Sequence, residues 1–289
     1  MAEDAKWPRA ASLISSDSSP IGLLDVPASK TSISQTSAHL TPKAIREALL
    51  RYSTYSYSTG KDLSKLSIQD LGEIKDPDSN EAKTTEAIKV ANKALTIALG
   101  GDNSITYAVG LGVFGNNLAT AGLITLDAHH DLRDGISNGS PVRRLIEAGL
   151  DPKRIVQIGI NDFSNSASYA QLASDLGITV ISREMVAEIG IKEACNIALS
   201  VAGSAEGPIH VDLDVDVCDR SVVPACPAAA PGGLSAFELR QATRILLSHE
   251  LVRGVDITEI DASKDSEDGR TVRLAALLVL ESVAGFQIR

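Results

Sequence analysis

Short, almost uninterrupted apolar runs alternate with helix-like segments along this chain of 289 residues. From these runs we predict eight strands, at residues 21–26, 66–71, 95–99, 123–126, 155–160, 178–181, 209–215 and 252–257. Strands that are apolar along their whole length are typical of sheets buried on both faces, and such sheets are mostly parallel. The expected fold class is therefore α/β, with three α/β/α layers around a mostly parallel sheet.

Helical periodicity fills the intervals between the strands. The predicted helices cover residues 41–52, 80–93, 142–148, 166–176, 192–201, 236–248 and 272–286. Thr41-Pro42 suits the start of the first helix, because Pro is favoured in the first helical turn. No linker divides the pattern, so we expect one domain over residues 1–289, with residues 1–20 as a loose N-terminal leader.

The charge balance excludes some classes of partner. Lys and Arg total 27 against 37 Asp and Glu, a formal net charge of −10, so no nucleic acid partner is expected. No apolar run approaches the ~18 residues of a membrane span, and the first residues contain no apolar signal segment. The three cysteines have no metal-type spacing. We therefore expect a cytoplasmic protein with no membrane partner.

Polar residues lie at the ends of four of the predicted strands or directly after them. These segments are residues 100–104 (Gly-Gly-Asp-Asn-Ser), 127–131 (Asp-Ala-His-His-Asp), 212–216 (Asp-Leu-Asp-Val-Asp) and 256–259 (Asp-Ile-Thr-Glu). In a parallel sheet the carboxyl ends of the strands lie at one edge, and ligands bind there. We expect the four segments to meet in one crevice.

Carboxylate and imidazole groups alternate in two of these segments. Residues i, i+2 and i+4 of an extended chain point the same way, which turns Asp127, His129 and Asp131 toward one point. Asp214 and Asp216 repeat the alternation on another strand. A solvated, acidic strand end is one explanation, and a metal site is the other, because clustered carboxylates need cations between them. Mixed carboxylate and imidazole ligands suit Mn²⁺, and four carboxylates balance two divalent ions.

The ordered motifs resemble those of the ureohydrolases, the family that includes arginase, agmatinase and formimidoylglutamase. The similarity extends from about Thr41 to the last residue and includes the motifs at 100–104, 127–131, 214–219 and 256–259. It implies an arginase-like single domain with a parallel sheet of eight strands. It also implies a dinuclear Mn²⁺ centre and a homo-oligomer, either a trimer or a hexamer.

The resemblance implies two sets of Mn²⁺ ligands. By motif position, one ion would be held by Asn103, Asp127, Asp131 and Asp214, and the other by Asp127, His129, Asp214 and Asp216. Glu259 matches the acid that holds the amidine or guanidine group of the substrate. The family usually has His where this chain has Asn103. Because an amide oxygen is a weaker donor than imidazole, one of the two ions is expected to be weakly held.

A second departure favours formimidoylglutamase over the guanidine hydrolases. Arginases and agmatinases carry a His, thought to shuttle protons, where this chain has Asn138. Formimidoylglutamases look like this chain instead. An Asp-x-Arg follows their metal motif, as Asp131-Leu132-Arg133 does here, and a Ser-x-Gly-Ser/Thr-Pro without His comes next, as at 137–141. The implied reaction is hydrolysis of N-formimidoyl-L-glutamate to L-glutamate and formamide.

The predicted roles follow from this reaction, in which a water activated by two Mn²⁺ ions attacks the formimino carbon. Asp131 would pass a proton to the departing amine, Glu259 would hold the amidine, and His130 could contact substrate or carry protons. A glutamate-like substrate has two carboxylates, and Arg133 is the first candidate to bind one of them. The other predicted substrate-binding residues are Asn138, Ser140 and Arg143.

Two alternatives stay open at this point. An agmatinase or guanidino-acid hydrolase would use the same metal centre and release urea. A metal-poor, non-catalytic binding subunit is the other alternative, and the absence of His at Asn103 motivates it. An activity screen separates the first from a formimidoylglutamase, and metal analysis separates the second.

Overall fold

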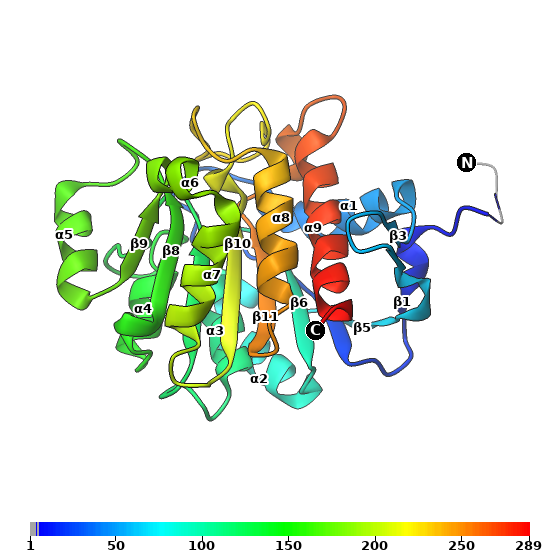
Figure 1. Cartoon of the computed structure of the whole chain (residues 1–289), viewed down its shortest axis with the longest axis horizontal. Helices are drawn as coiled ribbons and strands as arrows, with labels where there is room; N and C mark the ends of the chain where they lie inside the picture. Colours follow the sequence, from blue (N-terminus) through cyan, green and yellow to red (C-terminus); the bar gives the residue numbers. More distant parts are fainter. Residues whose placement is uncertain (1–3, 5) are drawn as a thin grey trace.

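A nine-stranded sheet lies at the centre of the computed structural model, which describes residue 4 and residues 6–289 (Figure 1). All of its neighbouring strands pair in parallel. In spatial order the strands are β1 (Ile14–Ser15), β5 (Ile68–Glu73), β2 (Ile21–Val26), β6 (Leu95–Gly100), β11 (Val252–Thr258), β10 (Ile209–Asp214), β7 (Gly122–Leu126), β8 (Ile155–Ile160) and β9 (Thr179–Ser182). The predicted parallel sheet is confirmed, with one strand more than expected.

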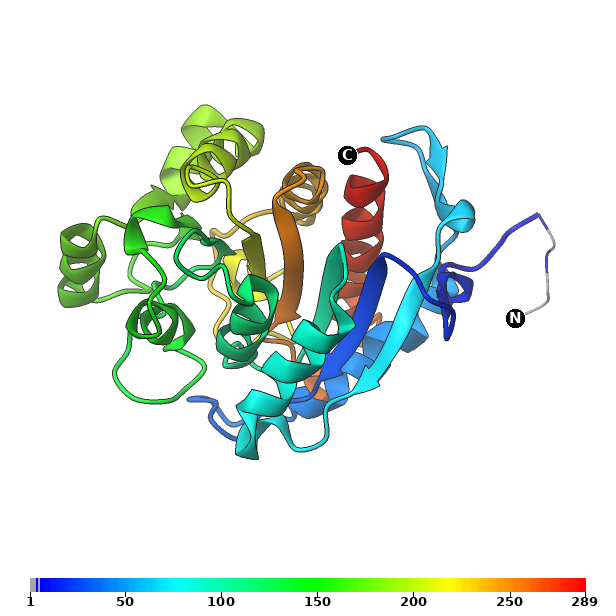
Figure 2. The same cartoon turned by 90° about the horizontal axis from the view of Figure 1, so that it is seen from below.

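Helices cover both faces of this sheet (Figure 2). The helices are α1 (Thr41–Ala48), α2 (Glu81–Ala91), α3 (Ile105–Phe114), α4 (Pro141–Glu147), α5 (Ala167–Leu176), α6 (Arg183–Ile189), α7 (Ile191–Ala202), α8 (Ala236–Leu247) and α9 (Arg270–Gln287). On one face α7 packs against α8, α8 against α9, and α9 against α1. On the other face α3 packs between α2 and α4. The three-layer α/β/α arrangement is therefore confirmed.

Burial explains why the strands are mostly apolar. Every residue of β2, β6, β7, β8 and β10 is buried, as expected for strands with helices on both sides. A separate antiparallel pair, β3 (Tyr55–Ser56) with β4 (Lys61–Asp62), lies outside the large sheet. None of the helices described is long and apolar enough to cross a membrane.

Part of the predicted loose leader is structured instead. Residues Ala10–Leu13 form a 3₁₀ helix, and Ala10 and Leu13 belong to the apolar core. Strand β1 follows directly and adds the ninth strand at the edge of the sheet, beside β5. In the sequence only Leu13 and Ile14 form an apolar pair within this Ser-rich segment, which is too short a pattern to predict the 3₁₀ helix or β1. Residues 1–3 and 5 of the leader lie outside the described residues.

Two helices were not predicted. α3 is apolar on most of its surface and contains two glycines, Gly110 and Gly112, so it shows no amphipathic period. Gly112 is needed for packing, because a Cβ there would lie 2.8 Å from the Cβ of Ile88 on α2. α6 has only seven residues and ends at Gly190 before α7 begins. Sequence periodicity is uninformative over so few turns.

Candidate active site

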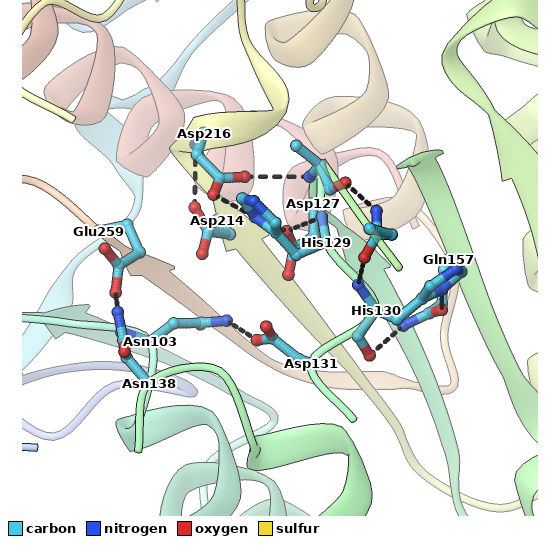
Figure 3. Close-up of polar contacts among 12 residues, drawn as sticks. Asn103, Asp127, His129, His130, Asp131, Asn138, Gln157, Asp214, Asp216 and Glu259 are labelled. Carbon is cyan, nitrogen blue, oxygen red and sulfur yellow. Dashed lines mark hydrogen bonds and ion pairs between the residues drawn. The ribbon is translucent and has the colours of Figure 1, made fainter. Parts of the chain in front are cut away.

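The four polar segments meet at the carboxyl ends of four adjacent strands, β6, β11, β10 and β7. The register aligns these ends, because Leu99 pairs with Ile257, Asp214 with Thr258, and Leu213 with Leu126. The side chains beyond the strands lie together in Figure 3. A cavity of about 390 Å³ is lined by several of them: His129, His130, Asp131, Asp214, Asp216 and Glu259. The predicted convergence at this edge of the sheet is therefore present.

His129 lies between two carboxylates at the centre of the cluster. Its Nδ1 is 2.8 Å from Oδ2 of Asp216 and 3.5 Å from Oδ1 of Asp127. One ligand atom from each of the three residues lies within 4.8 Å of the others. The three side chains come from the segments directly after two strands, β7 and β10, so the sheet brings them together (Figure 3). This spacing suits a shared metal ion.

Local backbone hydrogen bonds orient the carboxylates. Oδ1 of Asp127 accepts from the backbone N–H of His129 at 2.6 Å, and Oδ1 of Asp216 accepts from the N–H of Ala128 at 3.0 Å. Oδ1 of Asp214 accepts from the N–H of Asp216 at 2.9 Å. Oδ2 of Asp127 is buried and has no partner in the described part of the chain. A buried carboxylate oxygen without a donor is unfavourable, and a cation would satisfy it.

Burial and mutual repulsion disfavour the charged form of the carboxyl groups in this cluster. Burial raises the pKa of Asp127 and of Asp214 well above the usual range, and neighbouring carboxylates raise both further. Burial likewise raises the pKa of Asp131 to about 7. It raises the pKa of Glu259 to about 8, against the lowering effect of hydrogen bonds from Asn138 and Asn103. The donor set therefore fits divalent cations, which would replace protons as the neutralising charge.

His129 and Asp216 behave as an ion pair. Burial alone lowers the pKa of His129, but its hydrogen bond to Asp216 and the surrounding carboxylates raise that pKa to about 9. Burial raises the pKa of Asp216, and the hydrogen bond and charge of His129 outweigh it, so that the net pKa is lowered. An ion bound to His129 would have to replace this proton, because only the neutral imidazole is a ligand.

Two site residues have left-handed backbone conformations. Asp131 has φ of +52° and Glu259 has φ of +62°. Such angles are uncommon for residues other than Gly, although Asn and Asp adopt them more readily than Glu does, and they occur at functional sites where the surrounding structure holds them. At the end of β6, Gly101 allows a close approach, because a Cβ there would lie 1.7 Å from the carbonyl oxygen of Ala28. This turn places Asn103 beside Asp131 and Glu259.

Asn103 is oriented differently from the prediction. Its Nδ2 donates to Oδ2 of Asp131 at 2.7 Å. Its Oδ1 accepts from the hydroxyl groups of Thr106 at 2.8 Å and Thr258 at 2.9 Å. The amide oxygen therefore faces two threonines rather than the acidic cluster. In this orientation Asn103 supports Asp131, and coordination of Mn²⁺ through the amide oxygen would require the amide to turn over. The role of the two threonines had no signal in the sequence.

His130 points away from the carboxylates, toward Gln157 (Figure 3). Its Nδ1 lies 2.7 Å from Oε1 of Gln157, whose Nε2 donates to the carbonyl oxygen of His130 at 2.9 Å. Its backbone N–H donates to Oδ1 of Asn165 at 2.9 Å. Burial lowers the pKa of His130. His130 thus belongs to the cavity wall and is held by partners that the prediction did not include. A polar Gln157 inside an apolar strand was the available signal.

The predicted substrate-binding residues separate into two pairs. Arg133 and Asn138 line the cavity. Ser140 does not, because it is buried and its Oγ donates to the carbonyl oxygen of Ser137 at 2.8 Å. Arg143 also lies outside the cavity lining, where it pairs with Asp134 and with Glu147. The cavity lining therefore gives no support to the predicted substrate contact by Ser140 and Arg143: the Ser140 hydroxyl is bonded within its own loop, and Arg143 is paired with carboxylates on the surface.

The pKa shifts predict how the metal-free protein responds to pH. Asp131, Glu259 and His129 have raised pKa values of about 7, 8 and 9, so all three bind protons more tightly when folded. The stability that these bound protons give the folded state is lost as pH rises through these pKa values. We expect the Tm of the metal-free protein to fall between pH 6 and pH 9, and Mn²⁺ to restore it, because binding to the folded state raises stability.

Differential scanning calorimetry with and without chelator measures this effect. Glu259→Gln, which removes one of the three groups, should show a smaller fall in Tm. A metal-free Tm that rises over this pH interval would contradict the assignment of the cluster as a cation site.

Comparisons with known proteins agree with this geometry. A model of the arginase family matches residues 19–285. Formimidoylglutamase of Halalkalibacterium halodurans is 36% identical over 91% of this chain and 86% of its own length. The structure of formimidoylglutamase from Bacillus subtilis superposes with a TM-score of 0.92 at 31% identity, covering 100% of this chain and 95% of that one. Trypanosoma cruzi formiminoglutamase with Mn²⁺ shares the fold, with a TM-score of 0.90 at 24% identity and coverage of 98% and 99%.

Proposed function

This chain belongs to the arginase family, and we propose that it hydrolyses N-formimidoyl-L-glutamate to L-glutamate and formamide. It is a hydrolase homologous to formimidoylglutamases. The observation that carries the proposed substrate is the composition of one cavity. Glu259, a carboxylate, and Arg133, an arginine, line the same cavity as the acidic cluster. A substrate with a cationic amidine and two carboxylates matches these charges.

Arg133 is available for a substrate carboxylate. No carboxylate in the described part of the chain forms an ion pair with its guanidinium, whereas the neighbouring Arg143 and Arg144 are both paired. Its side chain packs over Gly139, since a Cβ added there would lie 2.8 Å from Cδ of Arg133. The backbone N–H of Arg133 donates to the carbonyl oxygen of Gly139 at 3.0 Å. This packing keeps Arg133 at the cavity, and a guanidinium can bind a carboxylate through two hydrogen bonds.

We propose that two Mn²⁺ ions bind at the cluster, by Asp127, His129, Asp131, Asp214 and Asp216, with one of them weakly held because Asn103 replaces a His. When bound, such ions lower the pKa of a water molecule and so supply the nucleophile. The five donors are all present and lie at one edge of the sheet, which supports a catalytic metal centre over a metal-poor binding subunit.

The chain's own residues position the substrate and move its proton. In the proposed reaction Glu259 holds the amidine, and Asn103 and Asn138 hold Glu259 through hydrogen bonds of 2.9 and 2.7 Å. Asp131 passes a proton to the departing amine, a role supported by its place on the cavity wall. His130 contributes through the shape of that wall.

The substrate screen tests the proposal directly. Mn²⁺-loaded protein is assayed with formimidoylglutamate, agmatine, arginine and guanidinobutyrate, and formamide, glutamate and urea are quantified. We expect kcat/KM for formimidoylglutamate to exceed the others by at least ~100-fold, since the cavity pairs both ends of that substrate. Higher kcat/KM with urea release from a guanidino compound would replace this function with that of a guanidine hydrolase. A cytoplasmic location and a trimer or hexamer of identical subunits remain predictions.

A further inference from the structure

The side-chain amide of Asn138 is bonded at both ends to the protein itself. Its Nδ2 donates to Oε1 of Glu259 at 2.7 Å, and its Oδ1 accepts from the backbone N–H of Ile33 at 3.0 Å. These partners are 121 and 105 positions away in sequence. Asn138 therefore joins a segment near the start of the chain to a carboxylate at the end of β11.

Glu259 is held on one oxygen and open on the other. Oε1 accepts from Asn138 and also from the backbone N–H of Asn103 at 2.9 Å (Figure 3). The backbone N–H of Glu259 donates to the carbonyl oxygen of Gly101 at 3.0 Å and keeps the residue in its left-handed conformation. No donor from the described residues bonds Oε2, and Glu259 lines the cavity. Oε2 is consequently the oxygen available to a ligand.

The other partner of Asn138 is part of the cavity wall. Ile33 and Ser34 both line the cavity, and Ile33 is 57% exposed. The backbone N–H of Asn138 also donates to the carbonyl oxygen of Thr31 at 3.4 Å. Two contacts from one residue thus attach the Thr31–Ser34 segment to the same side of the cavity as Glu259.

We propose that Asn138 is a positioning residue that holds Glu259 and the Ile33–Ser34 wall in one arrangement, so that Oε2 of Glu259 faces the amidine. This inference rests on the proposed function, in which Glu259 binds that group. These two hydrogen bonds fix the orientation of the Asn138 amide, so positioning of Glu259 does not depend on the direct substrate contact predicted from the sequence. One of them is to a carboxylate, and such charge-assisted bonds are the strong ones.

Two substitutions of Asn138 separate positioning from direct contact. Asn138→Asp keeps the size of the side chain and an acceptor for Ile33, but it places a carboxylate oxygen against Oε1 of Glu259. Asn138→Ala removes both hydrogen bonds. Ser137→Ala is the matched control, because its Oγ accepts from the N–H of Gly139 at 3.2 Å within the same loop and does not contact Glu259.

Steady-state kinetics with saturating Mn²⁺ give the first measurement. We expect kcat/KM for formimidoylglutamate to fall by ~10-fold in Asn138→Ala and by ~100-fold in Asn138→Asp, with less than ~2-fold change in Ser137→Ala. A direct contact predicts the opposite order, because a carboxylate at position 138 would attract the cationic amidine. A KM for Asn138→Asp equal to or below that of the wild type would overturn the proposal.

Crystal structures of the variants give a measurement that does not depend on the substrate. We expect the Glu259 carboxylate to turn away from the Asn103 N–H in Asn138→Asp, and the Ile33–Ser34 wall to shift in Asn138→Ala. Unmoved Glu259 in both variants would overturn the positioning role, whichever substrate the enzyme cleaves. The wild-type substrate screen separately decides the proposed function, so the two failures are distinguishable.

Discussion

Asp127→Ala and Asp214→Ala are each expected to abolish activity and bound Mn²⁺ together. Both carboxylates belong to the ligand sets of both proposed ions, so losing either one would leave neither ion fully coordinated. Because the proposed reaction needs these ions for its nucleophile, we expect kcat to fall by at least ~1,000-fold. The metal-free variants should be folded, since removing one buried carboxylate relieves the repulsion that raises the pKa of its neighbours.

Metal content per subunit, kcat and metal-free Tm are measured on the same preparations. Asp127→Asn and Asp214→Asn repeat the test with side chains of nearly unchanged size. Asp219→Ala is the matched control from the same segment, because its carboxylate accepts hydrogen bonds from Ser221 and Gly232 rather than lining the cavity. Full metal and full turnover in either Asp127 or Asp214 variant would place the reaction elsewhere on the molecule.

Arg133→Ala is expected to raise KM for formimidoylglutamate by at least ~10-fold while kcat changes by less than ~3-fold. Loss of a hydrogen bond between a guanidinium and a carboxylate is worth about 1.5–3 kcal/mol, which corresponds to roughly 10- to 150-fold in binding. In the proposed binding mode Arg133 holds the far end of the substrate, away from the reacting carbon, so the effect should fall on KM. Agmatine, which has no carboxylate, should lose nothing from the same substitution.

Arg143→Ala tests the specificity of that result. Arg143 is close in sequence and has the same charge, but it pairs with Glu147 at 2.9 Å and lies outside the cavity lining. We expect the KM of the Arg143→Ala variant to stay within ~2-fold of the wild type, because Arg143 lies outside the cavity and its exposed ion pairs contribute little to folding stability. An unchanged KM in Arg133→Ala, with agmatine as the better substrate, would reject the formimidoylglutamase proposal.

The sequence alone determined the architecture and the place of the site. Strands with almost no polar positions, such as β6 and β7, have to be buried on both faces, and this requirement selects a parallel sheet between two helix layers. Because parallel strands end at one edge, Asp127, His129 and Asp214 were expected at a common crevice before any strand order was known. These inferences need only the apolar pattern along each strand and the polar residues at its end, so they can be made without tertiary information.

Tertiary structure decided which side chains face the cavity and what holds them. The segment at 131–143 contains Arg133, Asn138, Ser140 and Arg143, and only the first two line the cavity. Asn103 was predicted as a metal ligand. In the structure its amide oxygen instead accepts hydrogen bonds from the hydroxyl groups of Thr106 and Thr258, which fix the orientation of the amide. Helix α3 had no period to reveal it because it is covered on most sides.

The physical reason is the range of the interactions concerned. Hydrophobic periodicity depends on residues three or four positions apart, so it can be read along the chain. The hydrogen bond between Asn138 and Glu259 joins residues 121 positions apart, and its existence depends on the order of strands and the course of two loops. Packing alone brings such partners within the ~3 Å that a directional hydrogen bond requires, and no local pattern records it.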